Sequence, residues 1–278
     1  MPALRSPLHR VLVLTALSGL SPSALAEVEA IDIEPQRGFR YALGAAAVVA
    51  PNYVGGSGQQ LKLRPLWALR YGSLRLSGAR ASGLLDAAGE SGSGVSADLF
   101  SGANWRLGTS LRMDSGRSPG DDGVLKGLPA IRSTLRGRLV GSVNWGKGWS
   151  SSIGYSSDLL GRSGGGITGL AVAYDWALTP GIRASVAGGG NWADRQHMST
   201  YFGISPEVAL ATSRAAYPTS AGLMNLHTGF GLRMPLGGQW TAFGGAGVSQ
   251  LQGEAAASPL TRSVRATSFS LALAWRSL

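Results

Sequence analysis

The residues of this sequence that are best suited to chemistry are arginines spaced along extended, strand-like segments. In the stretch 131–145, Arg132, Arg136 and Arg138 fall on one side of an extended chain, while apolar residues such as Leu135 fall on the other. A guanidinium group binds carboxylates and phosphates through paired N–H donors. This spacing therefore predicts a surface that holds or passes anions.

Catalytic and metal-binding chemistry has little support in the sequence. The chain has no cysteine, which excludes disulfides, thiolate metal sites and cysteine nucleophiles. His197 is close to Asp194 and Ser199 in sequence, but a triad is defined by its geometry in space. His227 lies on the polar side of a strand-like segment, where a structural histidine is expected. We therefore expect no enzyme activity, no metal and no cofactor.

Alternating polarity defines the elements that must position these arginines. Glycine makes up 42 of the 278 residues and charged residues only 14%, which is low for a soluble domain. Segments that alternate apolar and polar residues are separated by Gly, Ser, Pro or Asn, the pattern of strands joined by turns. Twelve segments fit the pattern: 38–49, 59–70, 73–79, 94–101, 105–113, 130–145, 149–158, 167–178, 182–191, 223–235, 240–251 and 264–277.

Two all-β architectures fit these segments, a soluble sandwich and a transmembrane antiparallel β-barrel. The lengths of the connections favour the barrel, because they alternate between short and long along the chain. Short periplasmic turns and long outer loops are typical of outer-membrane barrels. Aromatic residues at the strand ends also fit a membrane-interface girdle. The short connections are 71–73, 102–104, 146–148, 179–181 and 236–239, and the long ones are 50–58, 80–93, 114–129, 159–166, 192–222 and 252–263.

The first 26 residues have the features of a secretory signal peptide. Arg5 and Arg10 precede the apolar run 11–20, and Ala24-Leu25-Ala26 forms a small-x-small cleavage site. We expect cleavage after residue 26, which leaves residues 27–278 as a single barrel domain exported to the outer membrane of a Gram-negative cell.

Strand phase places a set of arginines on the inner face of the predicted barrel. Few acidic residues share that face, so one interpretation is an electropositive lumen that binds or passes anions. The other interpretation is that the arginines pack against aspartates, aromatics and loop carbonyls and fill a closed barrel. The candidates are Arg64, Arg70, Arg106, Arg112, Arg132, Arg136, Arg138 and Arg233.

The loop 192–222 is too long and too apolar for an ordinary hairpin connection. It is either a partner-binding or gating element, or a plug that packs into the mouth of the barrel. A short helix is expected within it, with Ser205 as the N-cap and Pro206 as the first residue. Tyr53, in the turn "PNYVGG", is expected to pack on residues 197–205 of this loop.

The last predicted strand carries large apolar residues at every second position. They are expected to face lipid and to act as the signal that the barrel-assembly machinery reads. These residues are Phe269, Leu271, Leu273 and Trp275.

Three stretches resemble the MltA-interacting protein (MipA)/OmpV family of Gram-negative outer-membrane proteins. They are "APNYVGGSG" at 50–58, residues 191–223 and "LQGEAAASPLTR" at 251–262, and together with the terminal strand they extend over most of the chain after residue 26. The residues that carry the resemblance and could serve as plug or partner contacts are Tyr53, Met198, Tyr201, Phe202, Gly203, Ser258 and Pro259.

The resemblance implies a non-enzymatic scaffold that joins a murein transglycosylase to a murein synthase. We expect contacts with outer-membrane lipid and lipopolysaccharide, assembly by the barrel-assembly machinery, and no binding of nucleic acid. The alternative function is a narrow, anion-preferring pore or small-solute channel with an arginine-lined lumen.

Overall fold

The computed structural model describes residues 39–71, 74–78, 94–118 and 123–277. The predicted signal peptide at 1–26 lies outside these residues. Twelve strands are found in the described part of the chain: β1 (Phe39–Pro51), β2 (Gln59–Tyr71), β3 (Leu74–Gly78), β4 (Gly94–Ser101), β5 (Trp105–Asp114), β6 (Thr134–Gly146), β7 (Trp149–Asp158), β8 (Gly166–Thr179), β9 (Ile182–Ala193), β10 (Gly222–Gly237), β11 (Trp240–Leu251) and β12 (Arg265–Arg276).

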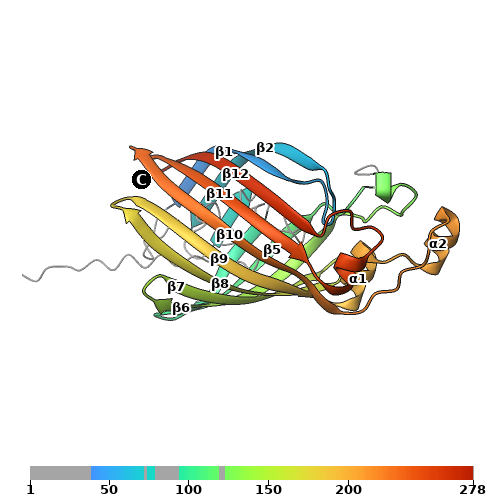
Figure 1. Ribbon diagram of the computed structural model, residues 1–278. Helices are drawn as coiled ribbons and strands as arrows, with labels where there is room; N and C mark the ends of the chain where they lie inside the picture. The colour runs from blue at the N-terminus through green and yellow to red at the C-terminus, as the bar shows by residue number, and fades with distance from the viewer. Residues whose placement is uncertain (1–38, 72–73, 79–93, 119–122, 278) are drawn as a thin grey trace, which may run out of the picture.

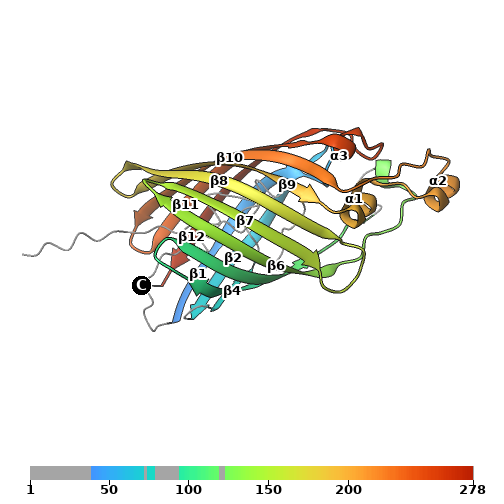
Figure 2. The same ribbon diagram turned by 90° about the horizontal axis from the view of Figure 1, so that it is seen from below.

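The strands form one antiparallel sheet that closes on itself (Figures 1 and 2). Each strand pairs with its neighbours in sequence, and β1 pairs with β12 from Val49↔Phe269 to Ala42↔Arg276. Closure gives each edge strand a partner for its backbone N–H and C=O groups, which an open sheet in hydrocarbon would leave unpaired. The predicted all-β, antiparallel architecture is confirmed.

Side chains alternate between a buried inner face and an exposed outer face. In β6, Thr134, Arg136 and Arg138 are buried, whereas Leu139 is 48% exposed. The outer face carries large apolar side chains, with Leu63 78% exposed. A polar interior behind an apolar exterior is the reverse of a soluble sandwich and is typical of a barrel surrounded by lipid.

The two ends of the barrel differ in the length of their connections. The loop end carries the connections after β1, β5, β7, β9 and β11, and the turn end carries the two-residue to three-residue turns after β4, β6, β8 and β10 together with Phe39 and Arg276. Helices α1 (Arg195–Phe202), α2 (Pro206–Thr212), α3 (Gly253–Ala257) and the 3₁₀ turn η2 (Gly123–Leu125) all lie at the loop end. Among the described residues, none of the helices is long and apolar enough to cross a membrane.

Backbone conformation explains the glycines at two places, the turn between β6 and β7 and the seam between β1 and β12. In the turn between β6 and β7, Gly146, Lys147 and Gly148 all have positive φ angles of 81°, 52° and 87°, which glycine adopts at little cost. At the β1–β12 seam, a Cβ on Gly44 would lie 2.2 Å from the carbonyl oxygen of Leu273. The seam therefore requires glycine at this position.

Ser277 extends the β1–β12 seam by one residue. Its backbone N–H donates to the Tyr41 carbonyl at 2.8 Å, and its Oγ accepts from the Tyr41 N–H at 3.0 Å. The expected assembly-signal side chains point outward: Phe269, Leu271 and Leu273 are 54%, 71% and 41% exposed. Trp275 is half-buried and packs beside Tyr41, with ring centroids 5.6 Å apart.

Aromatic side chains gather on the outer face at the turn end. Trp149, Tyr174 and Trp176 form a row across β7 and β8, with successive ring centroids 4.8 and 5.6 Å apart. Amphipathic rings of this kind prefer a membrane–water interface. These side chains correspond to the predicted aromatic girdle. The exposed Tyr71, Trp105, Trp145 and Trp240 belong to the same girdle.

Two sequence predictions about the elements are wrong. The sixth strand is expected to begin at residue 130, but β6 begins at Thr134 because the residues just before it leave the sheet, and Ile131 makes only a single bridge to Arg117. Arg132 is consequently exposed in that loop. The second error concerns the helix whose side chains pack into the mouth. This helix is α1, which has three buried side chains (His197, Met198 and Phe202), whereas the predicted helix starting at Pro206 has none.

Candidate functional site

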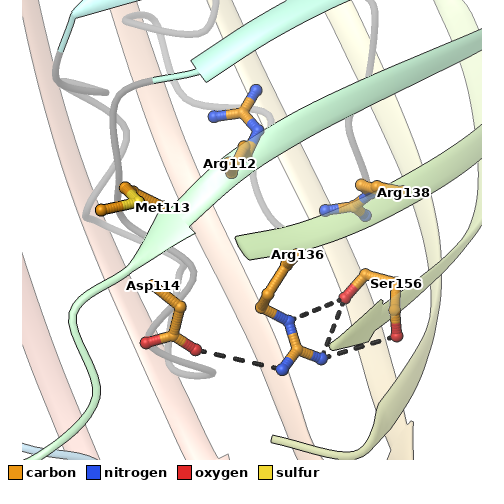
Figure 3. Close-up of a pocket in the computed structure, with 6 residues that line it drawn as sticks. All are labelled: Arg112, Met113, Asp114, Arg136, Arg138 and Ser156. Carbon is orange, nitrogen blue, oxygen red and sulfur yellow. Dashed lines mark hydrogen bonds and ion pairs between the residues drawn. The ribbon is translucent and has the colours of Figure 1, made fainter. Parts of the chain in front are cut away.

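Three arginines gather on the inner face at the loop end, in what we call the loop-end cluster: Arg112, Arg136 and Arg138, with Asp114 and Ser156. Arg112 comes from β5 and the other two arginines from β6, and they are 5%, 2% and 5% exposed. Figure 3 shows these side chains around a small cavity, with Arg136 between Asp114 and Ser156.

Arg136 is held by many acceptors. Its Nε and Nη2 each donate to Ser156 Oγ at 3.2 Å. Nη1 donates to the Gly164 carbonyl at 3.0 Å, and Nη2 donates to the Gly165 carbonyl at 3.1 Å. Asp114 Oδ2 lies 3.9 Å from Nη1. Arg136 therefore fastens the loop after β7 to the barrel wall, as the packing interpretation of the arginines predicts.

Arg112 and Arg138 add charge to the same small area. Arg112 lies directly opposite Arg136 in the β5–β6 register, and like charges in opposite positions destabilise a sheet. The cavity that these side chains line has a volume of about 10 Å³, which is close to the room that one water molecule needs. As the structure stands, nothing larger than a water or a small ion fits between these arginines.

A loop cap covers the mouth beside this cluster. One part of its core is a group of buried side chains from α1, α3 and the loop ends of the strands: Ile167, Ala193, Met198, Phe202, Met224, Leu251 and Ala255. A second part joins the other loops: Val124, Leu125, Leu128, Ile204 and Leu260. We call these two groups and the loops that carry them the cap. It is a small hydrophobic core of its own, built on the inner rim of the barrel.

Tyr201 connects the cap to the loop-end cluster. Its hydroxyl donates to Asp114 Oδ2 at 3.2 Å, and its backbone carbonyl accepts from Arg117 Nη1 at 2.8 Å. Its ring stacks on His197 with centroids 4.3 Å apart. Burial, reinforced by the Asp114 carboxylate, raises the pKa of the Tyr201 phenol well above its ordinary value of 10.0. The phenol therefore remains a proton donor at any physiological pH.

The residues that carried the family resemblance come together in the cap. Met198 and Phe202 are each 1% exposed. Ser258 Oγ donates to the Phe202 carbonyl at 2.6 Å, and Tyr53 OH donates to the Leu260 carbonyl at 3.1 Å. Tyr53 packs in the same group as Ile204, as expected for contact with residues 197–205.

Two other predicted cap residues have narrower roles. The N–H of Gly203 donates to the Ser199 carbonyl at 3.0 Å and ends α1. Pro259 is exposed.

The expected helix is present as α2, and Ser205 Oγ accepts from the Val208 N–H at 3.4 Å. However, α2 has no buried residue and extends beyond the barrel (Figures 1 and 2).

The remaining predicted arginines are not brought together. Arg106, at the turn end, lies 3.7 Å from Asp98. Arg64 is half-buried on β2, in phase with the buried Leu66. The side chain of Arg70 lies outside the described part of the chain. Arg233 is half-buried near the turn end of β10, and its direct register partner is Arg183 on β9.

The two histidines occupy structural positions. His197 is 2% exposed, and its Nδ1 lies 2.8 Å from the Gly164 carbonyl oxygen. Asp194 Oδ1 accepts from the His197 backbone N–H at 2.7 Å and caps α1. His227 lies on the inner face of β10 and is 5% exposed. In the described part of the chain, no group of three or more His, Asp or Glu side chains could hold a metal ion.

Sequence reasoning missed α1, α3 and the arginine pair Arg183–Arg233 as a feature of the turn end. A signal for α1 was present, since Asp194 stands where an N-cap aspartate is favoured. The pair could not be found from sequence because it depends on the β9–β10 register, in which Arg233 meets Arg183 only after a shift between Leu223 and Asn225.

Comparison with known proteins gives one family. The family described as MltA-interacting protein MipA matches residues 43–277. No curated protein sequence matches the chain.

Several solved barrels are similar in fold. The "CymD monoaromatic hydrocarbon channel" is 12% identical with a TM-score of 0.45, covering 94% of this chain and 98% of that one. The "KdgM porin in complex with disordered oligogalacturonate" is 10% identical with a TM-score of 0.42, covering 85% and 99%. "Outer-membrane expressed OmpT of Vibrio cholerae" is 8% identical with a TM-score of 0.38, covering 88% and 99%. Likeness at this level carries no functional argument.

Proposed function

The chain belongs to the MltA-interacting protein MipA family, and within it we propose the role of an outer-membrane barrel whose lumen selects small anions. The observation that carries the proposal is the direct opposition of like charges on the inner face. Arg183 opposes Arg233 at the turn end, whereas Arg136, opposite Arg112, already has Asp114 and carbonyl acceptors. Such pairs cost stability, and an anion in the lumen would offset that cost.

The apolar outer belt supports a place in the outer membrane. Leu63 and Leu271 are 78% and 71% exposed, and water would disfavour a continuous surface of this kind. In the proposed arrangement, residues 1–26 are a cleaved signal peptide, the barrel-assembly machinery inserts the barrel, and lipid and lipopolysaccharide surround it. The turn end faces the periplasm and the loop end faces outward.

The cap would control passage at the loop end. The cavity of about 10 Å³ between the loop-end arginines leaves room for about one water. A larger anion would pass only if the cap or the side chains of Arg112 and Arg138 move. Tyr201, which links α1 to Asp114, is the contact that such a movement would break. We therefore propose that the cap gates the lumen.

Planar-bilayer recordings test this function. The purified barrel is expected to show brief openings, and a Tyr201→Phe variant is expected to stay open for a larger fraction of the time because the link to Asp114 is lost. Gly203→Ala is unsuitable as a control because a Cβ there would lie 2.5 Å from the Ser199 carbonyl. Leu210→Ala, at a position of the same loop that is 86% exposed, is the control. Absence of conductance in all three proteins would contradict the proposal.

A scaffold in murein maintenance is the second candidate, and the observation that favours it is the family description, which names an interaction with MltA. A non-enzymatic barrel that binds a murein transglycosylase, and through it a synthase, fits that description. We place the channel ahead of it because the lumen charges belong to described side chains, whereas the scaffold role depends on the description alone. Co-purification of the barrel with a purified murein transglycosylase tests this role, and failure to co-purify at low salt would contradict it.

A further inference from the structure

The outer face of β11, β12, β1 and β2 changes from apolar to polar at the loop end. These four strands are consecutive around the barrel (Figure 1). On β12, the outward Phe269 is followed toward the loop end by Thr267 and Arg265, which are both exposed. On β2, the outward Leu61 is followed by the exposed Gln59. This change of polarity marks the level at which the outer face leaves the hydrocarbon region of a membrane.

Hydrogen bonds connect the polar side chains at this level into one row, which we call the outer rim: Gln59, Thr267, Arg265 and Gln250. Gln59 Nε2 on β2 donates to Thr267 Oγ1 on β12 at 3.1 Å, across β1. Arg265 Nε donates at 3.3 Å to Oε1 of Gln250, its register partner on β11. The rim therefore offers amide, hydroxyl and guanidinium groups side by side on the outside of the barrel.

A second exposed arginine, Arg262, lies in the loop just before β12. The backbone N–H groups of Arg262 and Ser263 both donate to the Gly55 carbonyl, at 2.7 and 3.0 Å. These bonds hold the loop against the connection between β1 and β2. Because Arg262 and Arg265 are both exposed, two guanidinium groups serve the same side of the barrel mouth.

Acidic residues are missing from this side of the chain. Residues 39–71 and 255–277, which include β1, β2 and β12, contain no aspartate or glutamate, and neither does β11. Glu254, just before the second of these ranges, accepts from Ser220 Oγ and from the Ser220 N–H at 2.8 and 2.6 Å. The rim is thus a basic surface directly above an apolar wall that includes the strongly exposed Leu63 and Leu271.

We infer that the outer rim binds lipid A, the diphosphorylated glycolipid that anchors lipopolysaccharide. Guanidinium groups match phosphate oxygens with paired donors, so Arg262 and Arg265 suit the phosphates. Gln59 and Thr267 can exchange hydrogen bonds with sugar hydroxyls. The apolar wall below the rim takes the acyl chains. The inference rests on the proposed outward orientation of the loop end, and it assigns a site to one of the lipids that surround the barrel.

Native mass spectrometry of the full-length mature barrel, titrated with diphosphorylated lipid A in detergent, tests the inference. We expect one retained lipid A per barrel and binding weaker by about tenfold in Arg265→Gln, because a charge-assisted contact is lost. The Arg262→Gln/Arg265→Gln double variant is expected to bind more weakly still. Arg132→Gln is the matched control, since it removes one exposed arginine at the loop end just before β6. Its affinity for lipid A is expected to equal that of the wild type.

Three results would overturn the inference: no lipid A retained by the wild type, equal weakening in Arg132→Gln and Arg265→Gln, or phosphatidylglycerol bound as tightly as lipid A. Unfolding curves of the variants should match the wild type, because both rim arginines are exposed. Bilayer recordings on the same samples separate this site from the proposed function. A barrel that conducts anions but retains no lipid A overturns only the rim site. A barrel that binds lipid A through the rim but never conducts supports the site and contradicts the channel.

Discussion

The loop-end cluster and the arginine pair at the turn end, Arg183 and Arg233, place the same residue type in two different settings. At the loop end, Arg136 is 2% exposed and donates to Ser156, Gly164 and Gly165. At the turn end, the arginines are half-buried, and Arg233 faces Arg183 across the β9–β10 pair. One setting uses the guanidinium as a hydrogen-bonding anchor for a loop. The other brings two guanidinium-bearing side chains of neighbouring strands face to face.

The difference shows that an arginine-rich lumen does not have one function. Carbonyl acceptors from the loop after β7 satisfy Arg136, and a buried, satisfied guanidinium contributes to packing. At the turn end, two half-buried arginines of neighbouring strands, Arg183 and Arg233, face each other. The acceptors that the long loop after β7 supplies make Arg136 a structural residue.

Replacing Arg136 is expected to have the largest effect. Arg136→Met leaves the Gly164 and Gly165 carbonyls and Asp114 without the guanidinium, and losing one side of a buried ionic group costs about 3–5 kcal/mol. Arg233→Met, the same change at the turn end, is expected to cost about 1 kcal/mol or less. Guanidinium unfolding of the detergent-folded barrel measures both. Equal losses of unfolding free energy in the two variants would contradict the distinction between the loop-end and turn-end arginines.

Ser258→Ala is expected to have the next largest effect and to act through the cap. The change removes the donor to the Phe202 carbonyl and the acceptor of the Leu260 N–H at 3.1 Å. Buried groups that lose their partners cost about 1–3 kcal/mol. The neighbouring Pro259→Ala, at an exposed position, should change the unfolding free energy by only about 0.5 kcal/mol. Faster amide exchange in α1 of the Ser258 variant, but not of the Pro259 variant, would localise the effect.

Tyr201→Phe is expected to cost about 1.5 kcal/mol, since one hydrogen bond to a carboxylate is lost. The raised pKa of Tyr201 also predicts a pH dependence. The unfolded chain would ionise this phenol near its ordinary pKa of 10.0, below the folded value, so the contribution of Tyr201 to stability is complete below pH 10 and decreases as pH rises above it. Tyrosinate absorbance tests this expectation. If the difference titration between wild type and variant shows a phenol that ionises at its ordinary pKa, the Asp114 contact is absent.

Arg183→Gln is expected to have the smallest effect on stability, about 0.5 kcal/mol or less in the stabilising direction, because repulsion with Arg233 is relieved. The same change should lower the preference of the lumen for anions. Unfolding curves and reversal potentials on one preparation measure the two effects together. A clear loss of stability would show that Arg183 is an anchor like Arg136.

The sequence predicts the barrel well because period-two alternation is a direct consequence of strand geometry. The predicted segments 94–101, 149–158 and 240–251 agree with β4, β7 and β11 to the residue. The order of short and long connections after β6 is also reproduced. Each of these features depends only on local residue order.

The candidate site was less predictable because it depends on contacts between distant loops. Arg132 follows the same alternation as Arg136, yet the chain before Thr134 leaves the sheet, and nothing local marks that point. The family-like residues were expected to form a plug, and Met198 and Phe202 are indeed buried in the cap. Which helix supplies the plug depends on the packing of α1 against α3 and the rim, which no single segment reveals.

The reversal potential of the wild-type barrel in a potassium chloride gradient tests the central claim most directly. An excess of guanidinium groups over carboxylates in the lumen predicts that chloride is more permeant than potassium, with a preference that decreases in Arg183→Gln/Arg233→Gln and declines as salt screens the charges. A reversal potential of the sign that potassium selectivity requires, or one that the double variant leaves unchanged, would contradict the account.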